Sequence, residues 1–402
     1  MKKIEYTKIK GHSIPYYGLL GGLGFTILLG LLSTWYMEHN GHHVTGMTNQ
    51  IVWGMPHVFA IFLIIAASGA LNVASIASVF GKKIYDPLSR LSALLAIALL
   101  AGGLVVLLLD LGRPDRLIVA ITTYNFKSIF AWNIILYTGF FAIVGAYIWM
   151  MMDHNMYKFK KKVGLLAFVW RLILTTGTGS IFGFLVARSA YDAALMAPMF
   201  IIMSFAFGLS IFILVLMAAY NWTGRELGDA VIARLRSLLG VFVASVLYFT
   251  IVYHVTNLYI TEHHGVEAFI LRDGGIYTNL FWFGQILLGG LLPLALIYAP
   301  GVKTCRTTLG AICTMIIIGG MCQVYVILIG GQAYPMEIFP GYEVSSSFFD
   351  GMVNSYSPTL PEIILGISGM AVSMLLVTFA IKVLSFLPTS LADSIADPHA
   401  AK

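Results

Sequence analysis

The side chains with the clearest chemical potential lie in one short stretch of the chain. Residues 110–116 read Asp-Leu-Gly-Arg-Pro-Asp-Arg and follow directly on a long apolar run. Charged groups next to lipid are costly unless they are paired or have a function. Asp110 and Arg113 are three residues apart, so they can share one helix face. Pro114 predicts that this helix ends at Arg113.

Further polar side chains should reach the same membrane face from neighbouring segments. His57 begins the preceding apolar run, Trp132 and Tyr137 lie early in the following one, and Asn125 stands in the connection before it. A His–Asp pair takes up protons near neutral pH. A Tyr or Arg can hold the second oxygen of a quinone. Together these residues predict a site for quinone redox chemistry.

The same residues also allow a purely structural interpretation. Arg113 and Arg116 can extend to the interface, with Asp110 neutralising them, and His57 can cap its helix. Residue chemistry alone leaves both interpretations open.

A second polar set is expected deeper in the membrane or on other spans. Arg171 lies eight residues past Val163, about 12 Å into its span at ~1.5 Å per residue. Thr175 follows on the same helix, while His254 and Gln323 lie on later spans. We expect either a polar track for protons or hydrogen bonds that join helices. Arg171 in particular needs a carboxylate, water or several carbonyls as partners.

Composition defines the solvent of this chain. Of 402 residues, 59% are hydrophobic and only 10% are charged, whereas an ordinary soluble domain is about a quarter charged. A soluble enzyme, a disordered chain and a nucleic-acid binder are therefore excluded. Apolar runs long enough to cross about 30 Å of hydrocarbon predict an all-α integral membrane protein with ten transmembrane helices: 16–37, 54–80, 89–112, 129–152, 163–187, 195–220, 237–261, 279–300, 305–333 and 361–387.

The distribution of Lys and Arg predicts the topology. Most of these residues fall in alternate connections, which places both termini in the cytoplasm. A few basic residues fall in outer connections instead, and three of them, Arg113, Arg116 and Lys127, lie in the same outer loop.

We expect a single integral-membrane domain, 1–402, built from two four-helix bundles. The first spans 54–187 and holds the quinone site, and the second spans 195–333. Helices 1 and 10 are peripheral, and residues 334–360 form an outer capping loop.

The cysteines give no sign of a resident cluster. Cys305, Cys313 and Cys322 form no C-x-x-C pair and no haem attachment motif. An iron–sulfur cluster would therefore sit on another protein. A haem b held by His57 and His254 stays open as an alternative. No metal site is predicted; the remaining histidines and carboxylates of the outer loops are typical of a solvated or docking surface, namely His39, His42, His43, His263, His264, Glu38, Glu262 and Glu267.

Three sequence stretches resemble the membrane subunit family of polysulfide reductase, NrfD/PsrC. They are the 110–116 motif, the following Tyr124-Asn-Phe-Lys-Ser-Ile-Phe-Ala-Trp132, and the late Tyr356-Ser-Pro-Thr-Leu-Pro-Glu362. Within that family, Gly331-Gln-Ala-Tyr-Pro-Met-Glu-Ile-Phe-Pro340 is most similar to DsrP of the sulfite-reduction-associated DsrMKJOP complex.

The resemblance implies a respiratory role in a prokaryotic cytoplasmic (inner) membrane. Such subunits carry no haem or iron–sulfur cluster and bind menaquinone near the outer face of the first bundle. They exchange electrons with a ferredoxin-like iron–sulfur subunit outside, and are accompanied by multihaem or haem b cytochromes and a cytoplasmic reductase-like subunit. The site residues it implies are His57, Asp110 and Arg113, with Tyr137, Trp132 and Asn125 as further lining, and Arg116 and Lys127 toward the partner. Proton movement by this subunit stays open. The rival interpretations are a transporter, a membrane anchor without a quinone site, and a proton-conducting or haem b-bearing subunit.

Overall fold

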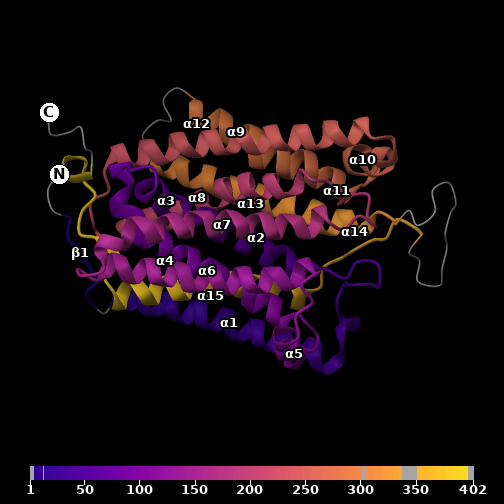
Figure 1. Ribbon diagram of the computed structural model, residues 1–402, viewed down its shortest axis with the longest axis horizontal. Coiled ribbons are helices and arrows are strands. Elements are labelled where there is room, and N and C mark those ends of the chain that lie inside the picture. Colours follow the sequence, from indigo (N-terminus) through magenta and orange to yellow (C-terminus); the bar gives the residue numbers. More distant parts are fainter. Residues whose placement is uncertain (1–3, 12, 300–304, 337–350, 397–402) are drawn as a thin grey trace.

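A computed structural model describes residues 4–11, 13–299, 305–336 and 351–396, and it is nearly all helical. Ten helices are long and apolar enough to cross a membrane in this part of the chain (Figure 1), which confirms the predicted all-helical fold with ten spans. The unbroken spans are α1 (Ile14–Asn40), α6 (Ile129–Met152), α8 (Met196–Thr223), α9 (Asp229–Tyr259) and α15 (Leu360–Val383). The protein is therefore a multi-pass membrane protein.

The other spans combine two or more elements. They are α2 (Met55–Ala70) with α3 (Asn72–Ser78), η2 (Lys83–Leu88) with α4 (Ser89–Leu109), η4 (Tyr157–Phe159) with α7 (Lys160–Gly183), α11 (Ile276–Asn279) with the π-helix η7 (Leu280–Leu291) and α12 (Leu292–Tyr298), and α13 (Arg306–Tyr325) with the π-helix η8 (Val326–Gly330) and α14 (Gly331–Ala333).

Short elements lie between the spans. They are η1 (His42–Val44), η3 (Pro114–Arg116), α5 (Leu117–Thr122), η5 (Thr261–His263), α10 (His264–Ala268), the π-helix η6 (Phe269–Asp273) and α16 (Asp393–Ala396). Two strands were not predicted: β1 (Tyr6–Thr7) pairs antiparallel with β2 (Leu387–Pro388).

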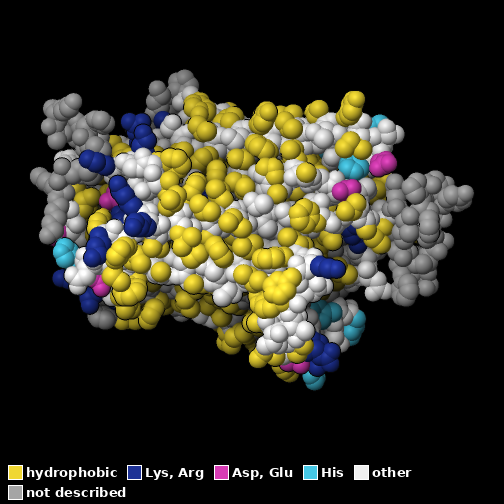
Figure 2. Space-filling model, viewed as in Figure 1, with side chains coloured by type: hydrophobic (Ala, Val, Ile, Leu, Met, Phe, Trp, Pro, Cys, Tyr) yellow, Lys and Arg dark blue, Asp and Glu magenta, His cyan; other side chains and the backbone are white. Residues whose placement is uncertain are grey.

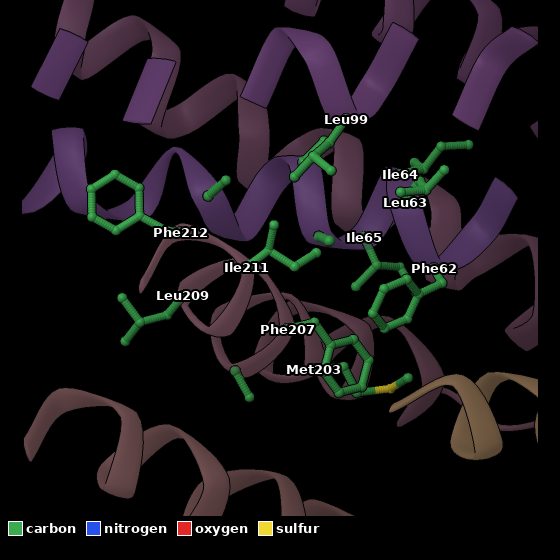
Figure 3. Packing of buried hydrophobic residues seen from close by; sticks show 14 of the residues in the cluster. Phe62, Leu63, Ile64, Ile65, Leu99, Met203, Phe207, Leu209, Ile211 and Phe212 are labelled. Carbon is green, nitrogen blue, oxygen red and sulfur yellow. The ribbon is translucent and has the colours of Figure 1, made fainter. Parts of the chain in front are cut away.

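Helix α2 lies at the centre of the molecule and packs against α4, α8 and α15. Its backbone touches that of α8, because a Cβ built on Gly69 would lie 1.6 Å from the carbonyl oxygen of Ser204. Phe62 of α2 stacks on Phe207 of α8 with ring centroids 5.3 Å apart (Figure 3). Small residues let helices approach closely where lipid provides no hydrophobic driving force, and this packing fixes the helix that carries His57.

The two ends of the molecule differ in charge. Hydrophobic side chains cover the middle of the surface, while Lys and Arg gather at one end (Figure 2). We call the end with β1 and β2 the basic end, and the opposite end, near α5, α10 and α14, the site end (Figure 1). The cytoplasmic location of the basic end stays a prediction from its charge.

The division into bundles 54–187 and 195–333 also stays a prediction, since α2 contacts helices of both. Most of the predicted capping loop, residues 337–350, lies outside the described residues.

Candidate functional site

The start of α2 is held by a clamp from the other end of the chain. The hydroxyl of Tyr356 accepts a hydrogen bond from the backbone N–H of Met55 at 2.7 Å and donates to Oε1 of Glu362 at 2.7 Å. Burial, together with the Glu362 carboxylate, raises the pKa of the Tyr356 hydroxyl, so it stays protonated and able to donate. A Cβ on Gly54 would lie 2.6 Å from Glu362 Oε1, so only glycine fits there. The clamp fixes the first turn of α2, where His57 lies.

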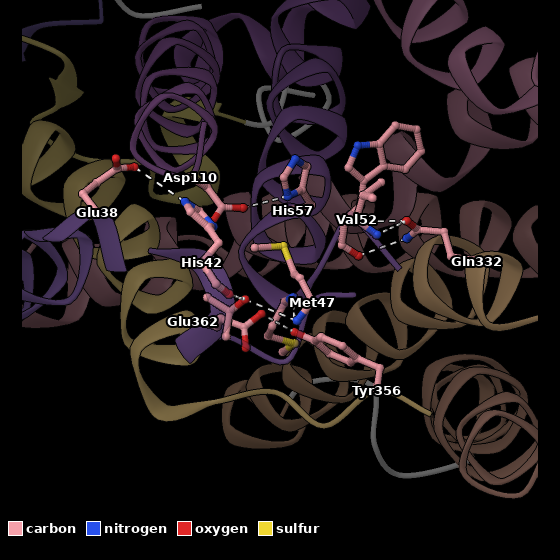
Figure 4. Close-up of polar contacts among 12 residues, drawn as sticks. Glu38, His42, Met47, Val52, His57, Asp110, Gln332, Tyr356 and Glu362 are labelled. Carbon is pink, nitrogen blue, oxygen red and sulfur yellow. Dashed lines mark hydrogen bonds and ion pairs between the residues drawn. The ribbon is translucent and has the colours of Figure 1, made fainter. Parts of the chain in front are cut away.

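His57 faces Asp110 across the site end of α2 and α4 (Figure 4). Their Nδ1 and Oδ2 atoms are 2.8 Å apart, and the Asp110 side chain is 0% exposed. The angles of this contact fall outside those of a hydrogen bond, so both carboxylate oxygens and Nδ1 count as buried atoms without a directed partner. We therefore describe it as a close polar contact, which is an ion pair only when His57 is protonated. Buried polar atoms without partners in the chain are the atoms that a bound molecule or water can satisfy.

An aromatic wall stands beside His57. The Trp53 ring is stacked at 29° to His57 with centroids 6.4 Å apart, and Phe130 lies 6.1 Å from Trp53 on the other side. The side-chain oxygen of Gln332 accepts the backbone N–H of Trp53 at 3.0 Å and so positions it. Phe130 is exposed at the apolar surface of α6. Trp53 and Phe130 therefore join His57 to the exposed aromatic surface of α6.

A cavity of about 520 Å³ opens beside Asp110. It is lined by residues of segment 42–52 and by Asp110, Leu111 and Gly112. His57 thus lies beside the aromatic wall, and Asp110 borders a cavity whose walls are partly polar and partly apolar.

Arg113 does not lie with Asp110, so the predicted shared face is wrong. Helix α4 ends at Leu109 and not at Arg113, because Gly112 adopts a φ of 68° and turns the chain. Arg113 instead pairs with Asp115 through Nε and Nη2, each at 3.1 Å, and both side chains are exposed.

Two other predicted site residues of this region, Trp132 and Asn125, bond to their own neighbours. Nε1 of Trp132 donates to the carbonyl of Phe126 at 2.9 Å, and Oδ1 of Asn125 accepts the backbone N–H of Lys127 at 3.1 Å. Trp132, Asn125, Lys127 and Arg116 are all exposed. In the described part of the chain, neither Trp132 nor Asn125 hydrogen-bonds to the His57–Asp110 pair.

Tyr137 lies deeper on α6 and is half-buried. Its hydroxyl is close to Thr178 of α7. Asn133, one turn nearer the site end, donates to the carbonyl of Gly177 at 3.2 Å. Tyr137 therefore belongs to a polar seam between α6 and α7 and makes no hydrogen bond to His57 within the described residues.

Arg171 is fully enclosed at 0% exposure. Its Nη2 donates to Oδ1 of Asn72 at 2.8 Å, and Nη1 donates to the carbonyl of Ser68 at 3.4 Å. Thr175 joins the group by donating to Ser68 Oγ at 2.6 Å. Among the described residues Arg171 has no carboxylate within ion-pair distance. The sequence predicts that Arg171 needs polar partners, but no sequence pattern identifies Asn72 as one of them.

His254 forms a second His–carboxylate pair, on α9. Its Nδ1 lies 2.7 Å from Oε2 of Glu267, which is 0% exposed and also accepts from Asn257 at 3.0 Å. Glu267 is therefore not part of a solvated surface as predicted; α10 folds it back onto α9. Gln323 lies nearby, with Nε2 3.5 Å from Oγ1 of Thr250, and both line a cavity of about 20 Å³ beside His254.

Trp53, Phe130, Gln332 and the Tyr356–Glu362 clamp were not predicted from the sequence. Phe130, Gln332 and the clamp fall within the stretches that carry the family resemblance, which was the available signal for them, whereas Trp53 lies outside these stretches. The spacing of Trp53 and Phe130 in the sequence gives no indication that their rings lie side by side.

Comparison with known proteins places the chain among membrane subunits of reductases. It is 27% identical to the Hdr-like menaquinol oxidoreductase integral membrane subunit of Archaeoglobus fulgidus, over 98% of this chain and 99% of the relative. It is 23% identical to a selenate reductase subunit of Mesobacillus selenatarsenatis (85% and 87%) and 24% identical to a polysulfide reductase polypeptide of Wolinella succinogenes (71% and 96%). Residues 43–336 match the sequence model of the NrfD family (polysulphide reductase, NrfD), so the chain belongs to this family.

Proposed function

We propose that this chain is the quinone-reactive subunit of a membrane oxidoreductase complex. It exchanges electrons between menaquinol or menaquinone at the site end and a docked ferredoxin-like iron–sulfur protein. The His57–Asp110 pair is the observation that carries this proposal. A relative over the full length is named a menaquinol oxidoreductase subunit, which supports the choice of substrate.

The pair has the chemistry that quinol oxidation needs. Removal of two electrons from a quinol releases two protons, and a positioned base must accept them. Because Asp110 faces Nδ1 of His57 at 2.8 Å, the second ring nitrogen, Nε2, is left for a quinol hydroxyl. The buried carboxylate stabilises the imidazolium that forms, as in other His–carboxylate pairs. In quinone reduction the same groups supply protons.

The surroundings of the pair fit a quinone. Trp53 and Phe130 offer flat apolar faces, and exposed Phe130 and Trp132 border the lipid from which a long isoprenoid tail would enter. Asn125 and Tyr137 are further lining candidates. The side chain of Asn125 bonds to the backbone of Lys127, and the Tyr137 hydroxyl lies beside Thr178. We therefore assign both residues a smaller role than His57 and Asp110.

The partner surface is assigned to the loop after α4. Arg113, Arg116 and Lys127 are exposed there, close to the pair in sequence and at the same end of the molecule. An acidic patch on an iron–sulfur subunit would complement them. Relatives named as parts of selenate and polysulfide reductases support assembly with further subunits. Cytochromes, a reductase-like subunit and a role in sulfur metabolism like that of DsrP belong to this proposal.

Two inner clusters support a proton path through the same subunit. Arg171 and Thr175 form one polar group within the membrane, and His254 with Gln323 forms another beside a small cavity. Enclosed polar groups of this kind mark proton routes in membrane proteins.

The test is quinol-linked reduction of the partner's clusters in the purified complex. We expect His57→Gln and Asp110→Asn to lower the rate by about 10²-fold or more, the usual contribution of a positioned base, with the complex still assembled. His264→Gln, an exposed imidazole at the same end bonded to the carbonyl of Leu258, is the control and should stay within about twofold of the wild-type rate. Unchanged rates in both site variants would refute the assignment.

A further inference from the structure

The His57–Asp110 pair has two separate sides. Nδ1 of His57 lies 2.8 Å from Oδ2 of Asp110 without a directed hydrogen bond, and Oδ1 of Asp110 is buried with no hydrogen-bond partner in the described residues. A buried carboxylate oxygen without a hydrogen-bond donor is costly. This oxygen therefore needs a donor that the described residues do not supply, such as water.

The cavity at Asp110 offers space for that water. Its volume of about 520 Å³ exceeds the share of several water molecules, each about 30 Å³ in the liquid. Asp110, His42 and His43 line it together. Because the cavity also meets the surface of segment 42–52, it brings the aqueous phase at the site end up to Asp110, whose carboxylate is still covered.

His42 and Glu38 stand along this connection (Figure 4). His42 Nε2 and Glu38 Oε1 are 3.6 Å apart, too long for a direct hydrogen bond, and both atoms are buried without a partner in the described residues. A polar gap of this length is one that a water molecule can bridge. The His42 ring also rests on the turn after α4, since a Cβ on Gly112 would lie 3.2 Å from Nε2.

The side chains of His42 and Glu38 are 30% and 28% exposed, so a path that leads from Asp110 through His42 to Glu38 ends at solvent. Asp110, at 0% exposure, is its inner end. Arg113 also lies within electrostatic reach of Glu38, and His43 lies beside His42 on the cavity wall. The order from inside to outside is therefore His57, Asp110, His42 and Glu38.

We infer that His42 and Glu38 form the proton exit of the quinone site. This inference rests on the proposed function. For each quinol oxidised, two electrons pass to the iron–sulfur partner and two protons leave the hydroxyls. His57 takes the first proton at Nε2 and gives its Nδ1 proton to Asp110, and water in the cavity carries that proton to His42 and Glu38. Rotation of the imidazole then presents its unprotonated nitrogen to the second hydroxyl, and the second proton follows the same route. In quinone reduction the protons enter by the same series.

The test uses chemical rescue in the assembled complex. We expect His42→Ala to lower quinol-linked cluster reduction at least tenfold, and added imidazole, which can enter the open cavity, to restore most of the rate. His39→Ala is the matched control. His39 follows Glu38 directly but stacks on Trp35, with centroids 5.4 Å apart, away from the cavity. This control should keep the wild-type rate and show no response to imidazole.

Two results would overturn the inference. One is a His42→Ala complex that keeps more than half of the wild-type rate, and the other is an assembled but slow His42→Ala complex that imidazole does not rescue. If this variant fails to assemble, Glu38→Gln decides: a rate at least threefold lower supports the exit, and an unchanged rate refutes it. A wild-type complex without quinol activity would instead refute the proposed function itself, so the two failures are distinguishable.

Discussion

The enclosed Arg171 gives the sharpest prediction about stability. Its guanidinium relies on the amide oxygen of Asn72 at 2.8 Å and on the Ser68 carbonyl at 3.4 Å. The rings of Phe168 and Phe205 lie 5.0 and 5.1 Å from its Cζ and add cation–π attraction. Replacement of Asn72 by Leu removes the shorter hydrogen bond and leaves a buried charge with less compensation.

The magnitude follows from these contacts. A hydrogen bond to a charged group contributes about 1.5–3 kcal/mol, and the cost of breaking a buried ion pair, about 3–5 kcal/mol, is an upper limit here because Asn72 is neutral. For Asn72→Leu we expect a loss of about 3 kcal/mol in the free energy of unfolding. Arg171→Met removes the charge together with its need for partners. The double variant should therefore be more stable than Asn72→Leu alone, with a coupling of about 2 kcal/mol.

The assay is unfolding by SDS in mixed micelles, followed by circular dichroism for the wild type, both single variants and the double variant. Additive losses in the double variant would refute the reasoning, since they would show that Asn72 does not compensate the charge of Arg171. A loss below about 0.5 kcal/mol for Asn72→Leu would refute it as well, because surface-like substitutions have effects of that size.

Three further predictions concern packing, the clamp and the second His–carboxylate pair. Gly69→Ala should destabilise the protein strongly in the same unfolding assay, because its Cβ would lie 1.6 Å from a carbonyl oxygen of α8, whereas Gly145→Ala, with no atom within 4 Å, should be neutral or slightly stabilising. Tyr356→Phe removes the acceptor for the first amide of α2 at 2.7 Å and should lower the quinol-linked rate severalfold, with a loss of about 1–3 kcal/mol in stability; an unchanged rate would show that the clamp does not position His57. Glu267→Gln should leave quinol oxidation within about twofold but reduce proton translocation in proteoliposomes, since it removes the buried charge beside His254; unchanged translocation would exclude this pair from the proton path.

The spans could be predicted from the sequence because their signal is local. A run of apolar residues must be about 20 long to cross the hydrocarbon, and all ten predicted runs correspond to helices. Helix ends were less predictable. Helix α4 stops at Leu109 because Gly112 adopts a positive φ, whereas Pro114 alone pointed to a later end.

The site was only partly accessible to the same reasoning. His57 and Asp110 could be expected near each other because adjacent antiparallel spans bring their neighbouring ends together. The Tyr356–Glu362 clamp joins α2 to residues about 300 positions away, and no local pattern encodes such a contact. Glu267 was misplaced for a similar reason: it follows polar residues in the sequence, and only the fold of α10 buries it.

The most direct test of the quinone assignment is the position of menaquinone in a side-chain-resolution map of the complex. We expect the headgroup at the site end, with one quinone oxygen within hydrogen-bond distance of Nε2 of His57 and the ring beside Trp53 and Phe130. A headgroup bound elsewhere, with the His57–Asp110 pair out of contact with it, would contradict the assignment.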